Sequence, residues 1–269
     1  MSGFITRFTT LLKLDAKLAL RHKLVHVTVV IALVFGVLVG FVLPSELTPR
    51  AIDQVVEPGA GVAPAPTVLE PEAKKPPFNQ LFIPILFAVD LSVLGFMFGA
   101  VMVLQDKDHG TIRWFRIGPG TSWDYLASKL TINLGLSLLN FVILVGLGAP
   151  AALADPRLTL LVLLTCAGMT LFGIGLAVFF RNLAQFFFPL AVVGLVGAMP
   201  MYLVLTPTAE LGWTWWLPTY HVLFGAEAIM FAGDPAVIRA ALGFCAAFTL
   251  VAAGFSGAGV DRRLMRETH

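Results

Sequence analysis

The chain alternates between long apolar runs and short polar breaks, and each run is long enough for a membrane-spanning helix. An α-helix needs about 20 consecutive apolar residues to cross a bilayer core. Six such runs are predicted as spans, at residues 24–43, 79–104, 130–149, 158–180, 186–205 and 236–260. The pattern therefore predicts an all-α polytopic membrane protein in which residues 1–269 form a single transmembrane domain.

Three segments outside these spans differ in character. Residues 4–23 carry apolar and basic side chains at helical spacing, which predicts an interfacial helix, although a charged lead-in without that role also fits. Residues 44–78 are rich in Pro, Ala and Glu and predict an irregular outer loop. Residues 206–235 hold a tryptophan cluster and an apolar run too short to cross, so we expect short re-entrant outer helices between spans five and six.

Composition identifies lipid as the main solvent of the chain. Hydrophobic residues make up 58% and charged residues only 13%, whereas a soluble domain carries about 25% charged residues. The formal net charge of +2 is too small to indicate nucleic acid as a partner. Cys166 and Cys245 each lie within an apolar run, and we interpret them as packing residues rather than as a disulfide or a metal site.

The distribution of positive charge predicts the orientation. With both termini in the cytoplasm, most of the 18 lysines and arginines fall in inner segments, and the outer segments hold only Arg50, Lys74, Lys75, Arg157 and Arg239. Excess positive charge on the cytoplasmic side is the usual arrangement in membrane proteins. The polar stretch at 105–129 is therefore predicted to be a cytoplasmic loop.

Within the predicted spans and the outer segment at 206–235, only a few polar side chains are candidates for a functional role. Asp90 lies near the middle of the second predicted span, where an acid is costly and should face protein or a water-filled cavity. It is either a substrate-pathway residue or a structural hydrogen-bonding residue. His221 and Glu227, in the outer segment, are interpreted as interfacial residues that form local hydrogen bonds.

The polar stretch at 105–129 is the most informative part of the chain. Gly110 and a Gly-Pro-Gly turn bracket a short amphipathic segment at 111–117, and Thr121 or Ser122 can cap a new helix with Asp124 in its first turn. An acidic-basic-acidic triplet, a Gly-Thr pair, a proline turn and a Ser-Lys pair follow one another along it, at Asp106, Lys107, Asp108, Gly110, Thr111, Pro119, Ser128 and Lys129.

This order of residues resembles the cytoplasmic loop of ABC-2 type transporter permeases, with His109 standing where that family usually has an acid. The resemblance implies a permease subunit of an exporter, in a bacterial plasma membrane, that moves a hydrophobic or amphipathic cargo such as a drug or lipid. It also implies a separate ATP-binding cassette ATPase that holds ATP and Mg, a second permease copy (identical or related), and no cofactor in this chain. The residues implied in ATPase coupling are Asp106, Asp108, Gly110, Thr111, Ile112, Trp114, Phe115, Arg116 and Pro119.

Motifs for other activities are missing from the sequence. It has no Gly-x-x-x-x-Gly-Lys-Ser/Thr phosphate loop, no His-Glu-x-x-His zinc motif and no Gly-x-Ser-x-Gly elbow. We therefore expect a transport permease rather than an enzyme. The alternatives are an ATP-independent secondary transporter or channel, which usually shows several intramembrane charges, and a membrane enzyme acting through Asp90 or His221.

Overall fold

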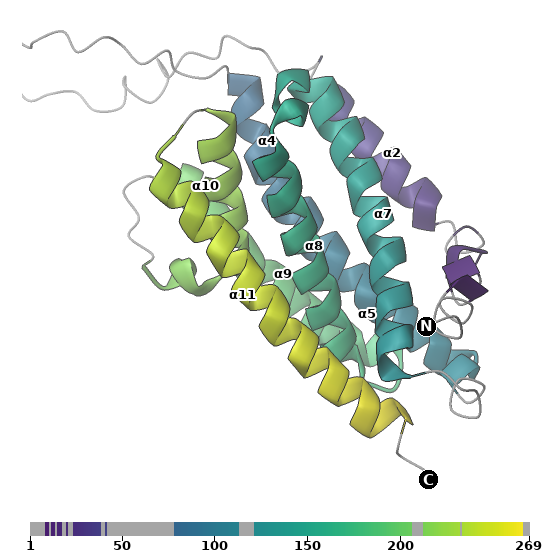
Figure 1. Ribbon diagram of the computed structural model, residues 1–269. Coiled ribbons are helices and arrows are strands. Elements are labelled where there is room, and N and C mark those ends of the chain that lie inside the picture. Colours follow the sequence, from purple (N-terminus) through teal and green to yellow (C-terminus); the bar gives the residue numbers. More distant parts are fainter. Residues whose placement is uncertain are drawn as a thin grey trace, which may run out of the picture.

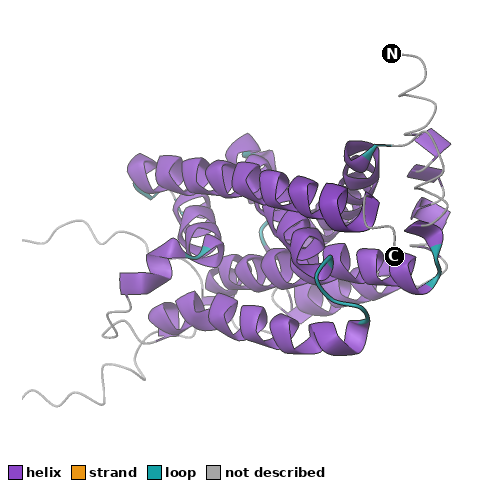
Figure 2. Cartoon of the chain, turned by 90° about the horizontal axis from the view of Figure 1, so that it is seen from below, coloured by secondary structure: helices purple, strands orange, loops and turns teal. Residues whose placement is uncertain are grey.

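The computed structural model describes residues 9, 10, 12, 13, 15–17, 20, 24–38, 41, 78–112, 121–205, 212–231 and 233–265. Within these residues the regular structure is helical throughout and no strand occurs (Figure 2). The all-α prediction is confirmed for this part of the chain. The predicted outer loop lies outside the described residues apart from Phe78, which begins a helix.

Five of the described helices are long and apolar enough to cross a membrane. They run over Phe82–Asp108, Ser122–Gly148, Pro156–Ala177, Leu183–Met201 and Pro235–Leu264. These correspond to the second through sixth predicted spans, so the chain has the character of a multi-pass, membrane-embedded protein.

The first predicted span is represented by α2 (Leu24–Val37), which has 14 residues. This described length is shorter than the about 20 residues that a crossing helix needs. The helix lies along α7 (Ser122–Gly148) (Figure 1), and a Cβ on Gly36 would come within 2.7 Å of Leu147 Cδ1. A sixth span therefore remains a prediction.

The second predicted span is a single helical run with an irregular turn at its centre. It consists of α4 (Phe78–Val89), the π-helical turn η2 (Asp90–Leu94) and α5 (Gly95–Asp108). Turns of π-helix are rare and occur often at functional sites. The run continues past Leu104, so the Asp106-Lys107-Asp108 triplet lies on the helix and not in the loop after it.

The remaining helices follow with short connections. They are η3 (Pro150–Ala154), α8 (Pro156–Ala177), α9 (Leu183–Leu205), η4 (Gly212–Trp216), α10 (Pro218–Met230), α11 (Pro235–Gly259) and η5 (Val260–Met265). Asp155 and Asp234 cap α8 and α11 by accepting backbone N–H bonds, and each cap is followed by proline. Two short helices, η4 and α10, lie between α9 and α11 in the chain, where the sequence predicts short outer helices. Their position on the outer side and their re-entry into the membrane remain predictions.

Helix α8 is the most buried of the five long helices and runs between α7 and α11 (Figure 1). It packs against α5 with almost no space between the two backbones. A Cβ on Gly173 would lie 2.1 Å from Phe96 O, and one on Gly99 would lie 2.5 Å from Thr170 O. Small residues such as Gly99 and Gly173 allow helices in membranes to approach this closely.

Apolar side chains form two buried clusters, one toward each end of the helices. One contains Ile83, Leu144, Leu161, Leu223 and Ala241, together with neighbours from the same helices. The other is built around Phe96, Leu126, Ile174, Phe186 and Val260. The polar groups described next lie at the end of the second cluster, where α5 finishes and α7 starts.

Candidate functional site

A buried group of charges joins three separate parts of the chain. Lys129 Nζ, on α7, lies 2.8 Å from Asp106 Oδ2 at the end of α5 and 2.7 Å from Asp15 Oδ1 in the N-terminal segment. All three residues are buried, with 4–7% of their surface exposed. We call Asp15, Asp106 and Lys129 the ion-pair cluster.

Two hydroxyl groups complete this cluster. Tyr125 donates a hydrogen bond of 2.8 Å to Asp106 Oδ2, and Ser128 donates to Asp15 Oδ2. Buried charges are tolerated only when they are paired and hydrogen-bonded. The hydroxyls supply this support on both sides of Lys129, so each carboxylate has two partners.

Lys107 makes a second anchor on the same turn of α5. Its Nζ donates to the carbonyl oxygens of Ala177, Val178 and Phe180 at distances of 3.1, 2.8 and 2.7 Å. These carbonyls lie at the end of α8, where a helix leaves acceptors unpaired and carries partial negative charge. Adjacent residues of the triplet thus attach α5 to α7 and to α8.

The other predicted coupling residues begin just beyond this anchor. Asp108 is exposed, Thr111 is half-buried and Ile112 is buried in the second apolar cluster. Gly110 has φ +68°, a left-handed conformation that glycine adopts without strain. The chain therefore turns sharply directly after the triplet. The last four predicted coupling residues lie outside the described residues: Trp114, Phe115, Arg116 and Pro119.

Helix α7 starts at a capping box, as the sequence predicts. Asp124 N donates to Thr121 Oγ1 at 3.2 Å, and Thr121 N donates to Asp124 Oδ2 at 2.8 Å. Ser122 Oγ also donates to Asp261 Oδ1 at 3.2 Å, which connects this turn to η5. The helix begins at Ser122, before the predicted span start at Leu130, so Lys129 occupies a rigid helical position.

Asp90 lies in η2, far along the helix from the ion-pair cluster. Its side chain is buried, with 8% of the residue exposed, and no hydrogen-bond or ion-pair partner for it is found in the described part of the chain. A polar seam runs between α7 and α8 in this region: Asn133 Nδ2 donates to Thr170 Oγ1 and to Gly95 O, and Ser137 Oγ lies 2.8 Å from Cys166 Sγ. Both interpretations of Asp90 remain open.

His221 forms the local hydrogen bond that the sequence predicts, and its position at a membrane interface stays a prediction. Its Nε2 donates to Trp215 O at 2.9 Å, and its ring stacks on Phe244 with a centroid separation of 4.0 Å. Burial lowers the pKa of the His221 imidazole and raises the pKa of the Glu227 carboxyl. No group of three or more His, Cys, Asp or Glu side chains suited to a metal ion occurs among the described residues.

Sequence reasoning missed two members of this site. Asp15 lies within the predicted interfacial helix at 4–23, yet it is the buried partner of Lys129. The only local signal for this role is that it is the single acid of that segment, between Lys13 and Lys17. Tyr125 follows directly on the capping-box acid and was not singled out.

Comparison of the chain with protein-family models, with curated proteins and with solved structures finds no match. The functional argument therefore depends on the residues and their geometry.

Proposed function

We propose that the chain is the permease subunit of an ABC-2 type exporter, driven by ATP hydrolysis in a separate ATPase. The observation that carries the proposal is the ion-pair cluster together with the Lys107 anchor. Together they fix the last turn of α5, which leads into the polar stretch at 105–129. This turn is attached to α7, to α8 and to the N-terminal segment.

This arrangement suits the transmission of force. The segment at 111–120 comes between Gly110, where the chain turns, and the capping box at Thr121. A partner that pushes on this segment would move the ends of α5 and α7 together, because Asp106 and Lys129 join them. Lys107 would pass the same displacement to α8. In this proposal the segment faces the cytoplasm, and the exposed Asp108 meets the ATPase.

The exposed apolar side of α9 is consistent with contact to lipid or to a second permease copy. Only 11% of the residues in the apolar part of this helix are buried. Phe187, Phe188 and Leu195 are each at least 60% exposed. Such a face needs an apolar environment, and both lipid and a second permease copy provide one.

The test is reconstitution with the ATPase that co-purifies in mild detergent. Asp108→Arg, or deletion of residues 112–117, should abolish cargo-stimulated ATP hydrolysis while the protein still inserts and elutes as wild type. Arg239→Glu is the matched control. It reverses a charge at an exposed position near the start of α11, away from the ion-pair cluster, and should keep the cargo-stimulated ATP hydrolysis. Normal stimulation in both test variants, or transport by the purified chain without any ATPase, would refute the proposal.

A further inference from the structure

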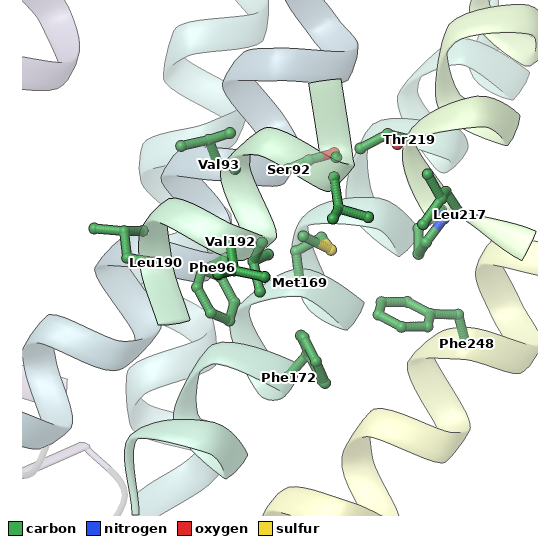
Figure 3. A pocket seen from close by; sticks show the side chains of 15 residues that line it. Ser92, Val93, Phe96, Met169, Phe172, Leu190, Val192, Leu217, Thr219 and Phe248 are labelled. Atoms are coloured by element: carbon green, nitrogen blue, oxygen red, sulfur yellow. The ribbon is translucent and has the colours of Figure 1, made fainter. Parts of the chain in front are cut away.

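A pocket opens between the π-turn η2, the start of α5, α8, α9, α11 and the start of α10. Its volume is about 270 Å³. Aromatic and aliphatic side chains form most of its wall, among them Phe96, Met169, Phe172, Leu190 and Phe248 (Figure 3). None of the residues that line it is charged. Pockets for small molecules are concave and mostly apolar, with a few polar groups that orient the ligand.

Two of its lining residues carry hydroxyl groups that have no partner. Ser92 Oγ and Thr219 Oγ1 are buried and form no hydrogen bond within the described structure. Their residues are only 1% and 3% exposed. Both lie toward the same end of the pocket in Figure 3, with the Phe172 and Phe248 rings toward the other end.

Unpaired buried hydroxyls are costly, so their presence in this wall needs a reason. Leaving a buried donor or acceptor unsatisfied costs about 1–3 kcal/mol, and native structures pair nearly all such groups. Alanine or valine would fill the same two places without that cost. Ser92 also lies on the π-turn, an irregularity frequent at functional sites.

We infer that this pocket binds a small, uncharged, amphipathic molecule. Its apolar rings or chains lie among Phe96, Phe172 and Phe248, and one polar group exchanges hydrogen bonds with Ser92 and Thr219. A ligand with a permanent charge is excluded because no lining side chain could neutralise it and burying an unpaired charge is strongly unfavourable. The role of this ligand as cargo rests on the proposed function, whereas its binding does not.

Helix α9 is the wall through which such a ligand enters. It contributes Leu190, Val193 and Gly197 to the pocket, and its opposite face is exposed. Its Pro189 and Pro200 each remove a backbone hydrogen bond within the helix. A wall with few buried residues and two weakened turns can move aside, so an amphipathic molecule dissolved in lipid reaches the pocket sideways.

The test is binding of 1-aminoanthracene, a neutral apolar fluorophore with one amine, to the full chain in lipid nanodiscs. Anthracene, which lacks the amine, is the matched probe, and nanodiscs without protein give the background. We expect saturable binding of both probes, with 1-aminoanthracene the tighter. Ser92→Ala combined with Thr219→Val should weaken 1-aminoanthracene binding roughly three- to tenfold, as for loss of neutral hydrogen bonds, and leave anthracene unchanged.

A second pair of variants locates the site. A Cβ on Gly197 would lie 3.5 Å from Thr219 Cγ2, so Gly197→Leu extends into the pocket and should abolish saturable binding of both probes. Gly243→Leu places the same side chain on α11 where a Cβ meets nothing within 4 Å, and should bind both probes as wild type. The inference fails if wild type shows no saturable binding, if Gly197→Leu binds normally, or if the hydroxyl variant binds 1-aminoanthracene as wild type. These measurements need no ATPase, so their failure is separate from failure of the proposed coupling.

Discussion

Asp106 and Lys129 form a buried ion pair that joins the two ends of the polar stretch at 105–129. Asp106 is on the last turns of α5 and Lys129 is on the second turn of α7, and their side-chain atoms lie 2.8 Å apart. The segment between them is thus held at both ends by the same buried contact. Asp15 adds the N-terminal segment to this contact through the same ammonium group.

Removal of the Lys129 charge should destabilise the protein strongly. Lys129→Met leaves Asp15 and Asp106 buried without a cation, and breaking a buried pair typically costs about 3–5 kcal/mol. The measurement is thermal or denaturant unfolding in detergent. Lys17→Met, which removes a charge from an exposed position of the N-terminal segment, is the control and should unfold as wild type.

A triple variant separates the cost of unpaired charge from the cost of lost packing. With Asp15→Asn, Asp106→Asn and Lys129→Met together, no charge remains buried in the cluster, and most of the lost stability should return. If the triple variant is as unstable as Lys129→Met, the cost comes from packing and not from unpaired charge.

Replacement of Gly173 by alanine should disrupt the contact between α5 and α8. The new Cβ would lie 2.1 Å from Phe96 O, a backbone atom that moves only with its helix. Overpacking of this kind costs about 1–3 kcal/mol or more, and the melting temperature should fall accordingly. Gly135→Ala is the matched control, because a Cβ on Gly135 of α7 meets nothing within 4 Å. Equal melting temperatures for the two variants would show that the two helices separate easily.

Whether a contact could be predicted from the sequence depends on how far apart its residues are along the chain. The helix start at Thr121 could be predicted because the capping residues Thr121 and Asp124 are only three positions apart and have the residue types that cap helices. The predicted span begins at Leu130, after the start of α7 at Ser122, because hydropathy marks where lipid contact begins, whereas Ser122–Lys129 is helical and polar. The Asp15–Lys129 pair joins residues 114 positions apart, and no local periodicity encodes such a contact.

The pocket and the π-turn were beyond prediction for a related reason. Gly95 and Gly99 are four positions apart in the sequence, but nothing local shows that Gly99 packs against Thr170 of α8. Ser92 and Thr219 are ordinary polar residues in the sequence. They stand out only once the folded chain buries both hydroxyls in one apolar wall.

Acidification should destabilise the contact between η4 and α10 through His221. Burial lowers the pKa of its imidazole, so the folded state binds a proton less readily than the unfolded state does. The stability contributed by the neutral ring is fully present above the unfolded pKa of about 6.5 and is lost as the pH falls through the lower folded pKa. The melting temperature should therefore drop between pH 7.5 and 5.5, and drop less in His221→Gln. Equal drops in the two proteins would assign the effect to other groups.

The Asp90→Asn variant decides between the two roles of this buried acid. Asparagine keeps the shape of the side chain and cannot carry a negative charge, for which the described structure offers no partner. Burying a neutral amide costs less than burying a charge, so the variant should assemble and melt at least as well as wild type. If Asp90 serves the substrate pathway, cargo transport by the reconstituted protein should change severalfold. Asp234→Asn is the matched control, because asparagine caps α11 as well as aspartate does and the residue is exposed. Failure of Asp90→Asn to assemble, with Asp234→Asn intact, would instead establish a structural role.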